Sequence, residues 1–123
     1  MMRLWIDDTG PPPDHYWHWA KTSEAAIAVL GCDVCEISFG ELAADSTYRG
    51  AKRIEQMARE GKIRPMVWHT HGEFAVTVAA VKGCMQRADL FWRAEKKEAA
   101  KPEHVRPLDA LWGKFMSATK REA

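Results

Sequence analysis

The sequence predicts an α/β fold of the flavodoxin or receiver type, in which a mostly parallel sheet of about four strands carries helices on both faces. The main observation is an alternation along the chain. Short apolar segments typical of strands alternate with segments whose apolar residues recur every three or four positions, as in helices. The length of 123 residues also suits a single domain of this kind.

Four segments are predicted to be strands, and each is rich in β-branched, aromatic or other apolar residues. They are "RLWIDD" at 3–8, "YWHWA" at 16–20, "DVCEISF" at 33–39 and "RPMVWHTH" at 64–71. Three prolines at 11–13 follow the first strand. Proline locks φ and lacks an N–H donor, so neither helix nor sheet is expected there.

Two helices are predicted between these strands. Thr22 caps a short helix over "SEAAIAVL", which Gly31 closes. A second helix is capped by Asp45 or Ser46 and runs to about Glu60. Because helices join successive strands, the sheet is expected to be mostly parallel.

Two further helices are predicted after the last strand. The first follows from apolar spacings of three and four at Phe74, Val78, Val81, Met85 and Ala88. The second is amphipathic, with one side formed by Leu108, Leu111, Trp112, Phe115 and Thr119. The chain is therefore divided into a receiver-like α/β domain at 1–94, a charged connector at 95–107 and a C-terminal amphipathic helix at 108–123.

Composition indicates an ordinary globular chain. Hydrophobic residues make up 46% and charged residues 28%, and the formal net charge is +1. No apolar run approaches the roughly 18 residues of a membrane span. Lys52, Arg53 and Arg59 are interleaved with Glu55 and Glu60, so no basic stripe marks a nucleic-acid site. We expect a cytoplasmic protein without membrane or nucleic-acid partners.

In a parallel sheet of this type, ligands bind outside the carboxyl ends of the strands, where the strand order reverses. This rule selects a group of polar residues at the predicted strand exits, all on one edge of the sheet. They are Asp7, Asp8, Gly40, Glu41, His69, Thr70 and His71.

The paired carboxylates Asp7 and Asp8 suit Mg²⁺, which takes one or two carboxylates and keeps several waters. The alternative is a turn at the strand exit, in which Asp8 forms an Asx-turn before Thr9. His69 and His71 alternate on a strand, so both imidazoles face the same way. They could share a metal, or one could be a hydrogen-bonded pocket residue while the other lies at the surface.

The chain has three cysteines and six tryptophans. Cys32 and Cys35 lie in "CDVCEISF", an extended stretch in which residues three apart point to opposite faces, which favours buried structural thiols over a metal or redox motif. The tryptophans are numerous for one small core, and tryptophan is enriched at protein interfaces. Three aromatic residues on or near helix stripes are therefore candidate partner-binding residues: Trp92, Trp112 and Phe115.

Five stretches occur in an order and spacing typical of one family. They are "LWIDD" followed by "PPP", "WAKTSEAAIAVL", "EISF", Gly50 within "STYRGAKRIEQMAREGK", and "HT" at 69–70. In this order they resemble the cyclic-phosphate-processing receiver-like domains, which are similar to response-regulator receivers. The resemblance covers roughly residues 3 to 90. It implies a phosphoester ligand, with metal held by aspartates.

The chain departs from this family at the site itself. Gly10 stands where the family has an arginine, "GEL" at 40–42 replaces Asp-His-Asp, and "HGE" at 71–73 replaces Ala-Asn-Pro. The family's site residues therefore carry over to four positions: Asp7, Asp8, His69 and Thr70. Such a loss of charge across one site suggests that the chemistry was abandoned, although Glu41 could replace one missing carboxylate.

Two functional hypotheses follow. The first is a non-catalytic receiver-like binding module without a cofactor, a regulator or inhibitor whose partner is another protein or, through the C-terminal helix, a second copy of the chain. The alternative is metal-dependent binding or processing of a cyclic phosphate or nucleotide phosphoester. In that alternative Mg²⁺ is held by Asp7, Asp8 and Glu41, while His69 acts as acid or base and Thr70 orients the phosphoryl group.

Overall fold

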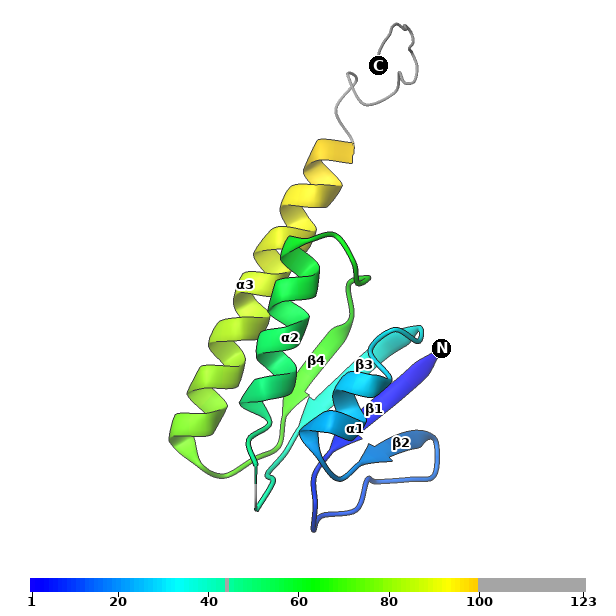
Figure 1. Cartoon of the computed structure of the whole chain (residues 1–123), viewed down its shortest axis with the longest axis vertical. Helices are drawn as coiled ribbons and strands as arrows, with labels where there is room; N and C mark the ends of the chain where they lie inside the picture. The colour runs from blue at the N-terminus through cyan, green and yellow to red at the C-terminus, as the bar shows by residue number, and fades with distance from the viewer. Residues whose placement is uncertain (44, 100–123) are drawn as a thin grey trace, which may run out of the picture. The chain divides into compact units, whose positions relative to one another are not determined.

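The computed structural model describes residues 1–43 and 45–99. Its four strands are β1 (Met2–Ile6), β2 (Trp17–Ala20), β3 (Val34–Phe39) and β4 (Val67–Thr70). They form one all-parallel sheet in the order β2-β1-β3-β4 (Figure 1). This is the order of the first four strands of a flavodoxin-like sheet, so the predicted fold class is confirmed.

Three helices accompany the sheet: α1 (Ser23–Ala28), α2 (Tyr48–Arg59) and α3 (Ala75–Ala99). As predicted, Thr22 caps α1, and its side chain accepts a hydrogen bond from the Ala25 N–H at 3.0 Å. The start of α2 differs from the prediction, because Thr47 occupies its N-cap position.

The two residues predicted to cap α2 form the turn that leads into it. Asp45 accepts from the Ser46 N–H at 2.7 Å, and the Ser46 hydroxyl accepts from the Tyr48 N–H at 3.2 Å. Their side-chain oxygens therefore satisfy N–H groups one or two residues further on, and the helix begins later than expected.

The core lies on one face of the sheet, between the strands and the helices. Leu4, Ile6, Ile37 and Phe39 alternate along β1 and β3 and are almost fully buried. Gly50 of α2 lies close above them, since a Cβ placed there would be 3.8 Å from the Ile6 side chain. Buried residues of all three helices belong to the same hydrophobic cluster.

Helices were expected on both faces, but α1, α2 and α3 pack on this same face (Figure 1). The reason is the handedness of the crossovers. The β2-to-β3 and β3-to-β4 connections cross the sheet in one direction, so right-handed crossovers put α1 and α2 on one face. The β1-to-β2 connection runs the opposite way and would place a helix on the other face, but it contains the three prolines at 11–13 and no helix.

No helix in the described part of the chain packs against the second face of the sheet, which we call the open face. It is formed by the strand residues whose side chains alternate with those of the core. They are Arg3, Trp5, Trp17, Trp19, Glu36, Ser38, Val67 and His69.

The last described helix is longer than predicted. It continues to Ala99, so residues 95–99 of the expected connector are helical. The rest of the connector, 100–107, and the predicted helix at 108–123 lie outside the described residues. The compact unit that contains the sheet comprises Met1–Trp92. No described helix is both long and apolar enough to cross a membrane.

The cysteines are not all buried as expected. Cys32 lies before the first residue of β3 and is exposed, while Cys35 in the strand is half-buried. Cys84 of α3 is fully buried in the core. Because β3 begins at Val34, Cys32 lies in the loop that precedes the strand.

Candidate functional site at the strand exits

The exits of β1, β3 and β4 lie side by side, as the parallel arrangement predicted. The Gly40 N–H donates to the Ile6 carbonyl at 2.8 Å and joins the exits of β3 and β1. The His71 N–H donates to the Phe39 carbonyl at 2.9 Å and joins the exits of β4 and β3. Polar residues that follow the three strands therefore share one edge of the sheet.

Asp7 is buried at this edge, and both of its carboxylate oxygens are hydrogen-bonded. Oδ1 accepts from the N–H groups of Thr9 at 3.0 Å and Gly10 at 2.8 Å, and Oδ2 lies 2.9 Å from His71 Nε2. Burial raises the pKa of Asp7, but the hydrogen bonds from Gly10, Thr9 and His71 outweigh it and leave the pKa below its ordinary value. The Asx-turn predicted for Asp8 is therefore made by Asp7.

His71 extends this hydrogen-bonded chain from β1 to β3. Its Nδ1 atom lies 2.7 Å from the hydroxyl of Ser38, and its ring stacks on Trp5 with 3.8 Å between centroids and 14° between planes. A neutral imidazole satisfies both neighbours, because Nε2 donates to the Asp7 carboxylate while Nδ1 accepts from the Ser38 hydroxyl.

Gly40 is what allows the imidazole to lie there. A Cβ at this position would be 2.2 Å from His71 Nε2 and 2.3 Å from Asp7 Oδ2. A side chain on residue 40 would therefore collide with both partners of the hydrogen bond. Gly40 is thus a packing requirement of the His71–Asp7 contact.

Asp7, His71 and Ser38 have the residue types of a serine-hydrolase triad, but the geometry does not support that chemistry. Ser38 is only 3% exposed, so its hydroxyl is not accessible as a nucleophile. The imidazole also faces the serine through Nδ1, whereas in such triads Nε2 takes the serine proton. The chain of hydrogen bonds serves to join three strands.

The other two predicted metal ligands are also engaged by backbone donors. Asp8 Oδ2 accepts a hydrogen bond from the N–H of Ala43. Glu41 Oε2 accepts from the N–H groups of Glu73 at 2.6 Å and Phe74 at 3.1 Å, immediately before α3. The Glu41 carboxylate thus occupies the helix N-terminus, the place where an anionic ligand binds in many α/β proteins.

His69 and Thr70 are separated by the alternation of the strand. His69 is on the open face, where its Nε2 atom lies 2.7 Å from Glu36 Oε2. The hydrogen bond from His69 is the main cause that lowers the pKa of Glu36, and Arg3, with Nε 3.0 Å from Oε1, adds to it. Thr70 is paired with Phe39 and belongs to the opposite face. The structure therefore does not bring His69, the predicted acid or base, together with Thr70, which was predicted to orient the phosphoryl group.

The carboxylates predicted to hold Mg²⁺ do not fit that ion as they stand. Within residues 1–43 and 45–99, no three histidine, cysteine, aspartate or glutamate side chains are grouped so that they could hold a metal. Asp7, Asp8 and Glu41 each accept hydrogen bonds from this chain's own donors. As placed, these carboxylates support the loops and the start of α3 and do not form a metal site among the described residues.

The role of His71 was only partly predicted from the sequence. Its alternation with His69 predicted that one of the two would be a hydrogen-bonded pocket residue, and His71 has that role while His69 is half-exposed. The sequence contains a further signal, since a glycine at a strand exit, here Gly40, often marks a close approach by another group. It does not identify that group.

Of the predicted partner-binding residues, only Trp92 is described. It is 5% exposed, and its Nε1 atom donates to the Ile63 carbonyl at 3.1 Å. The structure corrects its assignment: Trp92 packs in the core, because it continues the buried stripe of α3 that includes Ala88. Trp112 and Phe115 lie outside the described residues.

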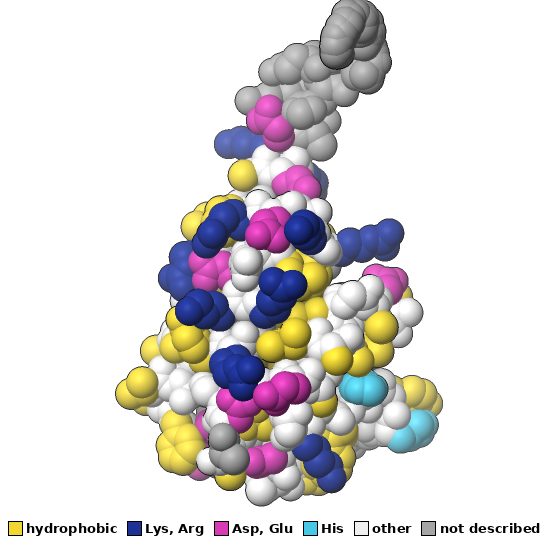
Figure 2. All heavy atoms as spheres, in the orientation of Figure 1, with side chains coloured by type: hydrophobic (Ala, Val, Ile, Leu, Met, Phe, Trp, Pro, Cys, Tyr) yellow, Lys and Arg dark blue, Asp and Glu magenta, His cyan; other side chains and the backbone are white. Residues whose placement is uncertain are grey.

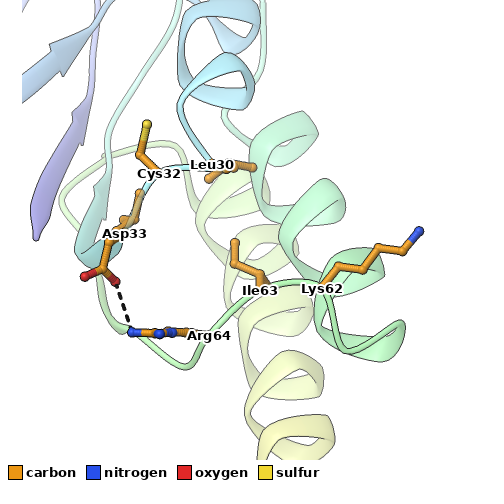
Figure 3. Close-up of a pocket in the computed structure, with 8 residues that line it drawn as sticks. Leu30, Cys32, Asp33, Lys62, Ile63 and Arg64 are labelled. Atoms are coloured by element: carbon orange, nitrogen blue, oxygen red, sulfur yellow. Dashed lines mark ion pairs between the residues drawn. The ribbon is translucent and has the colours of Figure 1, made fainter.

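A hollow of about 360 Å³ lies at the opposite edge of the sheet, between the loops that precede β3 and β4 (Figure 3). Asp33 and Arg64 form an ion pair across it with 3.8 Å between Oδ1 and Nη1. Figure 3 shows the side chains of Cys32 and Lys62 directed away from this pair. Because these polar groups do not converge, the hollow is a weaker candidate than the strand exits.

Comparisons with family models, curated proteins and solved structures find no match to this chain. Function therefore has to be argued from the strand exits and from the surfaces of the fold. Fold alone does not decide it, since flavodoxin-like sheets support many activities.

Proposed function

We propose that this chain is a non-catalytic, receiver-like binding module that acts through protein–protein interaction, as a regulator or an inhibitor does. The observation that supports this proposal most directly is the state of the crevice between β1 and β3. In sheets with this strand order, that crevice is where a ligand binds. Here the imidazole of His71 lies over Gly40 and bonds to Asp7, so the chain's own side chain fills the position.

The helix N-terminus beside the crevice supports the same proposal. A phosphate group would need the N–H groups of Glu73 and Phe74, and the carboxylate of Glu41 already accepts from both. A phosphoester would have to displace Glu41 and approach the ionised Asp7, and both steps are unfavourable.

The open face is the surface that we assign to the partner. All-parallel sheets in α/β proteins are normally covered on both faces, yet Trp5, Trp17 and Trp19 remain partly exposed here. Arg3 lies 4.4 Å from the ring centre of Trp17, and Lys21 lies 4.4 Å from that of Trp19. Arg3, Lys21 and His71 each cover one face of an indole ring. A nucleobase or a sugar stacks flat on a free ring face, so an apolar protein surface suits these indoles better.

The charges at the rim specify this partner further. Among the described residues Lys21 has no carboxylate partner, and its ammonium group lies over the ring of Trp19. A protein surface with an apolar centre and a carboxylate at its rim would complement both features. Indoles at the centre of such an interface commonly contribute most of the binding energy.

The metal-dependent alternative retains one favourable observation. Asp8 and Glu41 are joined at the rim, where the Asp8 N–H donates to the Glu41 carbonyl at 3.1 Å, and Asp7 is adjacent. Three carboxylate-bearing residues are thus neighbours, although their oxygens accept from donors of the chain. In that alternative Mg²⁺ would replace the N–H donors, and Asp8→Ala would weaken the metal site.

The experiment compares two substitutions that each add one negative charge at an exposed valine. Val67 lies on the open face and is 58% exposed, whereas Val76 on α3 is 85% exposed and lies outside that face. The wild-type chain and both variants are used to recover a partner from cells, and the recovered protein is then purified and its Kd measured for each variant. We expect Val67→Glu to weaken binding by more than about tenfold and Val76→Glu to leave it unchanged.

Two outcomes would contradict the proposal. Equal binding by Val67→Glu and Val76→Glu would show that the open face is not the interface. A larger rise in melting temperature with Mg²⁺ for the wild-type chain than for Asp8→Ala would support the metal-dependent alternative. Both measurements use the full chain and do not depend on knowing the partner in advance.

A further inference from the structure

A second surface, on the helical side of the molecule, has properties that the open face lacks. A hollow of about 340 Å³ lies between α2 and α3, and we call it the basic groove. Figure 2 shows Lys and Arg side chains over the region of α2 and α3, with Asp and Glu side chains between them. The groove is lined by Tyr48, Lys52, Glu55, Gln56, Arg59 and Arg87.

The lining of the basic groove has an excess of positive charge. Lys52, Arg59 and Arg87 are three cations, and Glu55 is the one carboxylate among the six lining residues. Three positive charges and one negative charge leave a net charge of +2. This excess is local, because the whole chain has a net charge of only +1.

The single carboxylate is already committed to one of the cations. Arg87 binds Glu55 in a bidentate pair, with 2.8 Å from Nε to Oε2 and 3.1 Å from Nη2 to Oε1. Arg59 is only at the limit of an ion pair with the same carboxylate, at 4.0 Å. Lys52 forms no ion pair with any described residue, and its ammonium nitrogen lies 5.9 Å from the ring centre of Tyr48.

Two cations near the ends of α2, Arg49 and Lys62, are paired with carboxylates. In the first turn of α2, Arg49 pairs with Asp45 at 3.0 Å and with Glu24 at 3.5 Å. After α2, Lys62 pairs with Glu60 at 3.4 Å. Along α2, unpaired positive charge therefore lies between these two ends, and a long polyanion such as nucleic acid that followed this helix would meet carboxylates at both of them.

We propose that the basic groove binds a short acidic segment of a partner protein. The side chains from Tyr48 to Arg59 span eleven helical steps, or about 17 Å along α2. An extended peptide rises about 3.3 Å per residue, so about five residues fit this length. Carboxylates of the segment bind Lys52 and Arg59, while the Glu55–Arg87 pair fixes the floor between them.

This inference extends the proposed function, since it specifies the chemistry of a partner at a surface other than the open face. It does not require that the indoles of the open face bind anything. The two proposals can therefore fail separately, and the variant Val67→Glu distinguishes them.

The test uses a fluorescein-labelled pentaglutamate peptide and the full chain. Binding is measured by fluorescence anisotropy. Changes in the amide chemical shifts of the ¹⁵N-labelled chain on addition of the peptide show where it binds. We expect shifts concentrated in α2 and in the part of α3 around Arg87. We expect Lys52→Glu or Arg59→Glu to weaken binding by at least about fivefold, as loss of an exposed ion pair does, and added salt to weaken it further.

The matched control is Arg64→Glu, which changes the charge by the same amount at a residue that is 84% exposed and lies outside the groove. We expect this variant and Val67→Glu to bind as the wild-type chain does. Equal weakening by Arg64→Glu, or shifts spread over all basic residues, would overturn the proposal. If a fifteen-residue oligothymidine bound more tightly than the peptide, the groove would be assigned to nucleic acid. If the chain self-associated and the peptide competed with that association, the groove would be assigned to a second copy of the chain.

Discussion

The Nε2 atom of His71 lies 2.9 Å from Oδ2 of Asp7, and this contact joins the exits of β4 and β1 across the exit of β3. The imidazole reaches that position because residue 40 has no side chain. Ser38 and Trp5 then hold the ring by a hydrogen bond and by stacking. These side chains at the strand exits are thereby part of the packing between strands.

The first prediction concerns Gly40→Ala. The added Cβ would lie within 2.3 Å of both His71 Nε2 and Asp7 Oδ2, so the hydrogen bond must break or the backbone must shift. We expect a loss of about 1–3 kcal/mol in the free energy of unfolding, as overpacked sites show. Urea denaturation measures it. Gly31→Ala is the control, since nothing lies within 4 Å of its Cβ position, and an equal loss in both variants would refute the role of Gly40.

The second prediction concerns the pH dependence of stability. The pKa of Asp7 is lower in the folded chain than its ordinary value, because hydrogen bonds from Gly10, Thr9 and His71 outweigh the effect of burial. The carboxylate therefore stabilises the fold fully above about pH 4, the ordinary range of an aspartate, and this contribution is lost as the pH falls through the lowered pKa.

Asp7→Asn removes that titration. We expect this variant to be less stable than the wild-type chain near neutral pH by about 1–3 kcal/mol, with the difference shrinking as the pH falls below about 4. Urea denaturation over this pH range measures the difference. Asp14→Asn is the control, since the Asp14 carboxylate accepts an exposed hydrogen bond from Tyr16. A difference that stays constant with pH would contradict the assignment.

The position of the strand exits could be predicted from the sequence, whereas their contacts could not. Alternating strands and helices require parallel strands, and parallel strands place Asp7, Gly40 and His71 at one edge. Which donor each carboxylate would meet depends on the paths of the loops after the strands. Those paths follow from close approaches such as that at Gly40, and sequence pattern alone does not specify them.

Two other differences from the predictions had signals in the sequence. The prolines at 11–13 exclude a helix from the β1-to-β2 connection, and that connection is the one whose helix would cover the open face. Residues 95–99 are "EKKEA", which are good helix formers, so α3 continues through them although they are charged. In both places the local backbone preference of the residues determined whether a helix formed, and the prediction gave this preference too little weight.

The third prediction concerns the carboxylate at the start of α3. Glu41 accepts hydrogen bonds from the N–H groups of Glu73 and Phe74, so Glu41→Ala leaves two donors without this partner. We expect a loss of about 1 kcal/mol in the free energy of unfolding, comparable to the loss of a helix cap, and faster amide exchange at these two residues. Glu41→Gln keeps an acceptor oxygen, and we expect a smaller loss. An unchanged exchange rate in Glu41→Ala would show that the cap does not persist in solution.

The last prediction separates a core residue from a surface residue on α3. Trp92 is 5% exposed and bonds to the Ile63 carbonyl, whereas Leu90, two residues earlier, is 57% exposed. We expect Trp92→Ala to lower the free energy of unfolding by about 3–5 kcal/mol, because it leaves a large cavity. Leu90→Ala should change it by less than about 0.5 kcal/mol. If Trp92→Ala kept its stability and lost only partner binding, Trp92 would be an interface residue, because a core tryptophan cannot be removed without a cost in folding.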